Sequence, residues 1–153
     1  AFGQGWSSFI DYSPKSETLV AVTQLGAVLE IWNAKKNTHQ VIKGKLGEPK
    51  FNISQDYAIP SGIKGYNDVH VTERAIYIIF VGLSFKEVIG KSQKGINFPE
   101  GGSTIRVFNL EGEPLKEYKL DHSVSGIWVD ERAGKMWALD VNSDEPLVEY
   151  ILK

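Results

Sequence analysis

The strongest constraint on the fold of this chain is a sequence pattern that recurs at a nearly fixed interval. The pattern combines a small polar residue, alternating apolar residues and an acidic residue, and it occurs at residues 8–12, 67–74 and 125–132. Aligning Ile10 with Val69 and Ile127 gives intervals of 59 (69 − 10) and 58 (127 − 69) residues. A second motif, at residues 28–33, is echoed at residues 104–109. Short strands that recur at a fixed interval are typical of blade-type repeats, in which one repeat cannot bury both of its faces.

The segments around these motifs have the composition of short β-strands separated by turns, because they are rich in β-branched and aromatic residues. We predict eleven strands in sequential up-and-down order, near residues 6–12, 18–24, 27–33, 38–44, 67–73, 75–83, 103–109, 114–120, 124–130, 135–141 and 146–151. No stretch keeps an apolar i, i+3, i+4, i+7 spacing beyond one turn, so no helix is predicted. Residues 45–65 and 84–102 are predicted to be long connections without strands, and such connections are often functional.

A meandering unit of four strands is the blade of a β-propeller. We therefore predict an all-β fold, a partial six-bladed β-propeller with about three four-stranded antiparallel blades, the last of which lacks its outer strand. The prediction treats residues 1–153 as a single partial domain, with blade units at about 6–46, 64–121 and 122–153. A β-sandwich is the competing architecture. It explains the alternating strands, but not the matched first strands at nearly equal intervals.

Composition argues against several classes of function. Acidic and basic residues are interspersed and the formal net charge is −2, so no nucleic-acid partner is predicted. The chain has no cysteine, which excludes disulfides and thiolate metal sites. The longest apolar run, residues 75–81, is far shorter than the ~20 residues of a membrane-spanning helix, so no transmembrane segment is predicted. The chain opens at Ala1 without an initiator Met or a signal peptide, so we expect a processed or cut segment.

Several segments carry a resemblance to a known family, namely residues 63–69, 76–87, 105–112, 118–120, 129–132, 136–139 and 148–150. Together they resemble the C-terminal half of the TolB-like six-bladed β-propeller family, whose blades are similar in style to NHL repeats. The resemblance implies a bacterial envelope protein, periplasmic or lipoprotein, with no assigned enzymatic activity. The implied function is a ligand- or protein-binding scaffold, with the ligand unspecified.

An arc of three blades leaves apolar faces and a strand edge open. We therefore expect the chain to pair with the remaining blades of the ring or with a second copy of itself, as a possible homodimer.

Side chains that suggest catalysis are few. Asp121, His122 and Ser123 are consecutive, and because neighbours on a strand point to opposite faces they cannot form a catalytic triad among themselves. His70, near Asp68, lies in a strand that would line the central channel, where six-bladed lactonases hold metals. A metal-dependent lactonase-type hydrolase is therefore the alternative function. No catalytic residue, metal ligand or cofactor is predicted, and an enzyme is the less favoured hypothesis.

The segment after residue 84 is the best candidate for ligand recognition. It carries an aromatic and a cationic side chain, Phe85 and Lys86, among glycines. Such a loop over one face of a propeller suits an anionic or carbohydrate-like ligand, although a solvated loop is the structural alternative. Tyr66, Asn67 and Asp68, which begin a channel-side strand, are plausible neighbours, with a turn that caps the strand as their alternative role. We predict a ligand site formed by these five residues.

Overall fold

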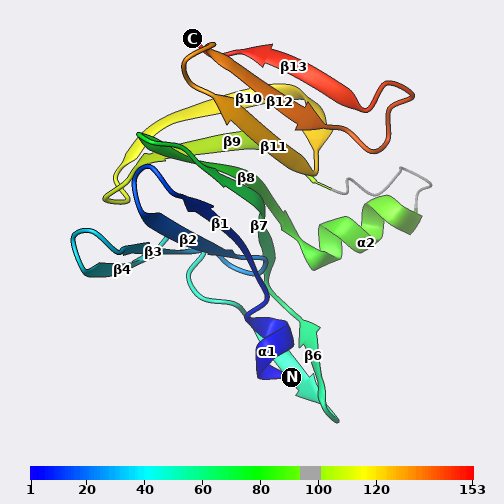
Figure 1. Cartoon of the computed structure of the whole chain (residues 1–153). Helices are drawn as coiled ribbons and strands as arrows, with labels where there is room; N and C mark the ends of the chain where they lie inside the picture. The colour runs from blue at the N-terminus through cyan, green and yellow to red at the C-terminus, as the bar shows by residue number, and fades with distance from the viewer. Residues whose placement is uncertain (94–100) are drawn as a thin grey trace.

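The computed structural model describes residues 1–93 and 101–153 and shows antiparallel sheets that stand side by side in an open arc (Figure 1). Its elements are α1 (Phe2–Gly5), β1 (Ser8–Ser13), β2 (Thr18–Thr23), β3 (Val28–Asn33), β4 (Thr38–Lys43), β5 (Phe51–Ser54), β6 (Tyr57–Pro60), β7 (Ile63–Val71), β8 (Ala75–Ser84), α2 (Phe85–Gln93), β9 (Gly102–Asn109), β10 (Pro114–Val124), β11 (Gly126–Asp130), β12 (Lys135–Leu139) and β13 (Leu147–Ile151). Strands β1–β4, β7–β10 and β11–β13 form three sequential meanders, here called the first, second and third sheets. The predicted fold class is confirmed, including the missing outer strand of the last blade.

The turns inside the meanders show why these segments form hairpins. Asn33 and Asp130 end strands β3 and β11, and each side-chain oxygen accepts a backbone N–H from the following loop, that of Lys36 at 2.7 Å and that of Ala133 at 3.0 Å. Each loop closes with a residue of positive φ at the position before the next strand. Asn37, with φ 50°, and Gly134, with φ 64°, are residues that tolerate this conformation.

Strand β8 is buried on both faces and joins the two apolar cores of the molecule. On one face, Ile76 and Ile78 pack with Val20, Leu29 and other residues of the first sheet. On the other face, alternate residues of the same strand pack against the third sheet, and they are Ala75, Tyr77 and Ile79. The near-continuous apolar sequence of β8 follows from this position, because a strand with two covered faces has no solvent side.

The first and second sheets also meet through their backbones. The N–H of Gly65 donates to the carbonyl of Gln24 at 2.7 Å, and the N–H of Gly26 donates to the carbonyl of Ile63 at 2.9 Å. A Cβ atom at Gly65 would overlap the carbonyl oxygen of Gly26. The start of β7 therefore requires glycine at position 65 for close backbone approach.

The prediction that residues 45–65 contain no strand is wrong. Strands β5 and β6 form a hairpin there, which projects from the arc beside α1 in Figure 1. In each of these strands large apolar residues alternate with smaller or polar ones, as a strand requires. The glycines and prolines of the segment mostly flank the hairpin, and Gln55, with φ 53°, makes its turn.

The prediction of no helix is also wrong, because α2 begins where a loop was expected. Ser84 and Glu87 form a reciprocal cap: the Ser84 hydroxyl accepts the N–H of Glu87 at 3.2 Å, and a Glu87 carboxylate oxygen accepts the N–H of Ser84 at 2.8 Å. This capping box stabilises the first turn of a helix, and its Ser-x-x-Glu spacing is visible in the sequence. Residues 94–100 of the predicted loop lie outside the described residues.

Polar contacts fasten the end of β10 to the third sheet. Asp140 accepts a hydrogen bond from His122, with Oδ2 and Nδ1 2.8 Å apart, and the Tyr150 hydroxyl donates to Asp121 at 2.8 Å. Asp121 and His122, for which a triad was excluded from the sequence, thus form a structural link between the second and third sheets. The hydrogen bond with His122 is the main cause that lowers the pKa of Asp140.

We expect Gly65→Ala to destabilise the chain by about 3 kcal/mol or more, because its Cβ overlaps a backbone carbonyl that cannot move independently. Urea unfolding followed by circular dichroism measures the loss. Gly90→Ala is the matched control, since a Cβ at this position in α2 has no neighbour within 4 Å. It should leave stability unchanged or raise it by about 0.5–1 kcal/mol through helix propensity. Equal losses in the two variants would contradict the close approach at Gly65.

Acid should weaken the link between the second and third sheets. The folded pKa of Asp140 is lowered below its unfolded value of about 3.9, so its stabilising effect is complete above that pH and is lost as pH falls through the folded pKa. Asp140→Asn should therefore lose less stability than the wild type between pH 5 and pH 2, measured by urea unfolding. Asp144→Asn, in the same loop, should keep the wild-type slope. A slope for Asp140→Asn that matches the wild type would refute the assignment.

Candidate functional site

The first strands of the three sheets, β1, β7 and β11, lie next to one another along the inner edge of the arc. Asp11, His70 and Trp128 occupy equivalent positions of the repeated pattern in these strands. Asp11 Oδ2 lies 3.5 Å from His70 Nδ1, and the His70 ring lies 5.6 Å from the Trp128 ring. Each of the first two side chains thus contacts its equivalent in the following sheet.

Two carboxylates bind the inner strands together. Asp11 Oδ2 accepts the backbone N–H of Val71 at 2.7 Å, and Asp68 Oδ2 accepts the backbone N–H of Ile127 at 2.9 Å. Burial raises the pKa of Asp68, while the hydrogen bond from Ile127 acts in the opposite direction. Both acids therefore have a structural task, which is to satisfy backbone donors of the neighbouring sheet.

A cleft of about 570 Å³ opens where the three inner strands end, and its walls come from all three sheets. Its charged side chains are mostly acidic, and they are Asp11, Lys15, Glu73, Asp130, Glu131 and Arg132. Among residues 1–93 and 101–153, no three His, Asp or Glu side chains are grouped so that they could hold a metal ion. The cleft is a mixed polar surface without a described metal cluster.

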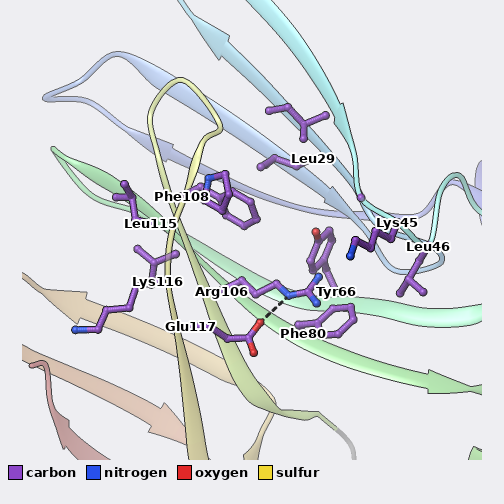
Figure 2. A pocket seen from close by; sticks show the side chains of 14 residues that line it. Leu29, Lys45, Leu46, Tyr66, Phe80, Arg106, Phe108, Leu115, Lys116 and Glu117 are labelled. Atoms are coloured by element: carbon purple, nitrogen blue, oxygen red, sulfur yellow. Dashed lines mark hydrogen bonds and ion pairs between the residues drawn. The ribbon is translucent and has the colours of Figure 1, made fainter.

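A second hollow, here called the wedge pocket, lies between the first and second sheets and has a volume of about 610 Å³ (Figure 2). Its floor holds Tyr66, a residue that is 2% exposed and whose ring lies 5.9 Å from that of Phe80. The Arg106 guanidinium lies over the Phe80 ring, 3.5 Å from its centroid, and Arg106 Nε donates to Glu117 at 3.2 Å. Burial raises the pKa of the Tyr66 hydroxyl, and the nearby Arg106 charge opposes that rise.

The structure distributes the five predicted site residues over three places. Tyr66 faces the wedge pocket, Asn67 donates from Nδ2 to the carbonyl of Ser125 at 3.2 Å, and Asp68 binds the third sheet. Phe85 and Lys86 begin α2, next to the N-terminal end of β7, because Ser84 pairs with Ile63. No described contact brings the five together, so their common ligand site stays a prediction.

Sequence reasoning did not select Phe80 or Arg106. Arg106 interrupts a run of apolar residues in β9, between Ile105 and Val107, which face the opposite core. A charged residue at an alternating position of an otherwise apolar strand indicates a polar environment on that face, and this signal was available in the sequence. The partner across the wedge, Lys45, lies in a connection and has no comparable signal.

The chain matches the model of a protein family described as TolB-like 6-blade propeller-like, over residues 1–132. No curated protein sequence matches the chain. No helix among the described residues is long and apolar enough to cross a membrane.

Two solved structures that resemble the chain have low sequence identity to it. The β-propeller domain of Myceliophteria thermophila Cps50 (Swd1) is 13% identical, with a TM-score of 0.50 over 97% of this chain and 39% of that one. Kuenenia stuttgartiensis hydrazine synthase is 14% identical, with a TM-score of 0.48 over 86% of this chain and 28% of that one. This chain spans less than two-fifths of the length of either structure. At these identities the similarity to Cps50 shows the fold alone.

We expect Asp68→Ala to destabilise the chain by about 1–3 kcal/mol, because the backbone N–H of Ile127 would lose its acceptor in a partly buried junction. Urea unfolding measures the effect. Asp56→Ala, in the exposed turn of the β5–β6 hairpin, is the matched control and should change stability by less than about 0.5 kcal/mol. If the two variants unfold at the same urea concentration, the carboxylate of Asp68 does not hold the sheets together.

Proposed function

We propose that this chain, which belongs to the TolB-like 6-blade propeller-like family, is an arc of a non-enzymatic β-propeller that serves as a binding or scaffold module in the bacterial envelope. The proposal rests on one contrast. Apolar cores fill the junctions between neighbouring sheets, whereas large apolar side chains are exposed at both ends of the arc. The envelope location rests on the family alone.

At the third-sheet end, Trp128 is placed to contact a further blade. Asp11 contacts His70 in the next sheet, and His70 contacts Trp128 in the one after. Trp128 holds the next equivalent position, and it is 54% exposed. Large apolar side chains are also exposed on β12 and β13, and they are Leu139, Leu147 and Ile151. A solvent-exposed surface of this composition marks an interaction site.

At the first-sheet end, one row of side chains crosses all four strands. Tyr12 pairs with Leu19, Leu19 with Trp32, and Trp32 with His39. The Trp32 and His39 rings stack, with centroids 4.6 Å apart. Because Val20, next to Leu19, belongs to the core shared with the second sheet, this row lies on the opposite, uncovered face of the first sheet.

Further blades of the same type would cover both ends of the arc. A six-bladed ring contains twice the three sheets of this chain, so either the remaining blades of the ring or a second copy of the chain would cover both ends. A scaffold of this kind presents its clefts and its connecting loops to ligands while the sheets stay rigid.

The lactonase-type hydrolase is the weaker alternative. The acids nearest the inner edge already accept backbone N–H groups: Asp11 that of Val71, and Asp68 that of Ile127. Asp130 accepts the N–H groups of Arg132 and Ala133 through one oxygen. Carboxylates engaged in holding the backbone are poorly placed to move protons or to gather round a metal, which favours the binding role.

We expect the purified chain to associate, so that light scattering at micromolar concentration gives a mass above the 17.0 kDa of one chain. Trp128→Glu should shift the mass toward the monomer, because it places a charge on the uncovered face of the third sheet. Ile53→Glu, on the β5–β6 hairpin, is the matched control for an exposed apolar side chain and should leave the mass unchanged. A stable, well-dispersed monomer of the wild-type chain would remove the support for paired ends.

A further inference from the structure

We propose that the wedge pocket binds a small aromatic carboxylate, with its anionic group at Tyr66, Arg106 and Lys45 and its ring against Phe108 and Leu115. The inference rests on the proposed binding function and names a ligand class for it. It concerns a site at the junction of the first and second sheets, away from the open ends of the arc.

The anionic subsite is built from side chains that are held in place. The Arg106 side chain is 31% exposed, and its guanidinium is stacked on Phe80 while Nε donates to Glu117. Arginine has five N–H donors in a rigid fork. Nε is bonded to Glu117 and the guanidinium also lies within hydrogen-bonding reach of the Tyr66 hydroxyl, so the remaining N–H donors can bind a carboxylate beside Tyr66. The Tyr66 ring is fixed by burial, and in Figure 2 the Lys45 ammonium points toward it.

The charges that line the pocket favour an anion. Lys45 and Arg106 are the cationic side chains near Tyr66, and Glu117 is the one carboxylate among the lining residues. The ammonium of Lys116, a third cationic lining residue, lies over the Tyr118 ring, 4.8 Å from its centroid. Glu117 is already shared by Arg106 and by Lys119, whose Nζ lies 2.8 Å from its other oxygen. Glu117 therefore does not balance the charges of both Arg106 and Lys45. A ligand carboxylate beside Arg106 and Lys45 would neutralise part of their positive charge.

The remaining lining residues are apolar and favour a flat apolar group, such as the aromatic ring of the ligand. The pocket's apolar side chains come from both sheets and from the connection after β4, and they include Leu29, Ile42, Leu46, Phe80, Phe108 and Leu115. Leu115 is 59% exposed and lies at the open side, whereas Leu29 is buried at the floor. A volume of about 610 Å³ with an apolar lining and a few convergent polar groups is typical of small-molecule sites. The aromatic ring of Phe108 suits stacking with the planar ring of such a ligand.

Titration calorimetry with naphthalene-2-carboxylate tests the proposal, with neutral 2-naphthalenemethanol as the uncharged counterpart. The carboxylate should bind saturably and about tenfold more tightly than the alcohol. Lys45→Gln should weaken carboxylate binding by about three- to tenfold and leave alcohol binding unchanged, because it removes an exposed charge contact only. Leu115→Glu should weaken carboxylate binding by about tenfold or more, because it places a like charge at the opening.

Lys35→Gln is the matched control, since it removes the same charge from the exposed turn between β3 and β4, outside the pocket. It should leave the affinity for the carboxylate unchanged, and all variants should unfold at the wild-type temperature by circular dichroism. Equal affinity for carboxylate and alcohol, or no effect of Lys45→Gln, would overturn the proposal. Weakening by Lys35→Gln alone would place the anion at the β3–β4 turn instead. The mass of the chain is measured separately, so a failure here is distinguishable from a failure of the ring proposal.

Discussion

The two-sided burial of β8 is the interaction on which the rest of the structure depends. Ile76 and Ile78 complete the core with the first sheet, while Tyr77 and Ile79 complete the core with the third. Because successive side chains of a strand point to opposite faces, one strand can serve two cores only if nearly all its residues are apolar. Neither end sheet has such a strand with two covered faces, and the wedge pocket and inner cleft both lie at junctions that β8 and its neighbours create.

Apolar packing fixes which sheets meet, but polar and backbone contacts fix how they meet. The glycine contact between Gly26 and Gly65 sets the closest approach of the first two sheets. The carboxylates of Asp11 and Asp68 each accept one particular backbone N–H of the inner strand in the next sheet. Because a hydrogen bond has a narrow range of geometry, these contacts fix how far each inner strand is shifted along its neighbour. These contacts therefore determine where the residues that line the wedge pocket and the inner cleft lie.

Much of the fold was predictable because the inner strands repeat and the turns carry asparagine, aspartate and glycine at the required positions. The β5–β6 hairpin was not predicted because each of its strands has only four residues in which apolar residues alternate with smaller or polar ones. The glycines and prolines around them indicated a loop. Helix α2 was missed although Ser84 and Glu87 carry its capping signature. The site was less predictable: Tyr66 was selected from its strand, but its neighbours Arg106 and Lys45 come from β9 and a connection, and only the packing of two sheets brings them together.

The equivalent positions 11, 70 and 128 have a consequence for how such a ring can evolve. The backbone repeats at these positions, but the side chains are a carboxylate, an imidazole and an indole, and the two junctions they form differ in chemistry. A blade copied by gene duplication into another slot would meet the wrong neighbour on at least one side. The order of the blades is therefore specified by the side chains at the junctions, and an exchange of two blades would place unmatched side chains against each other.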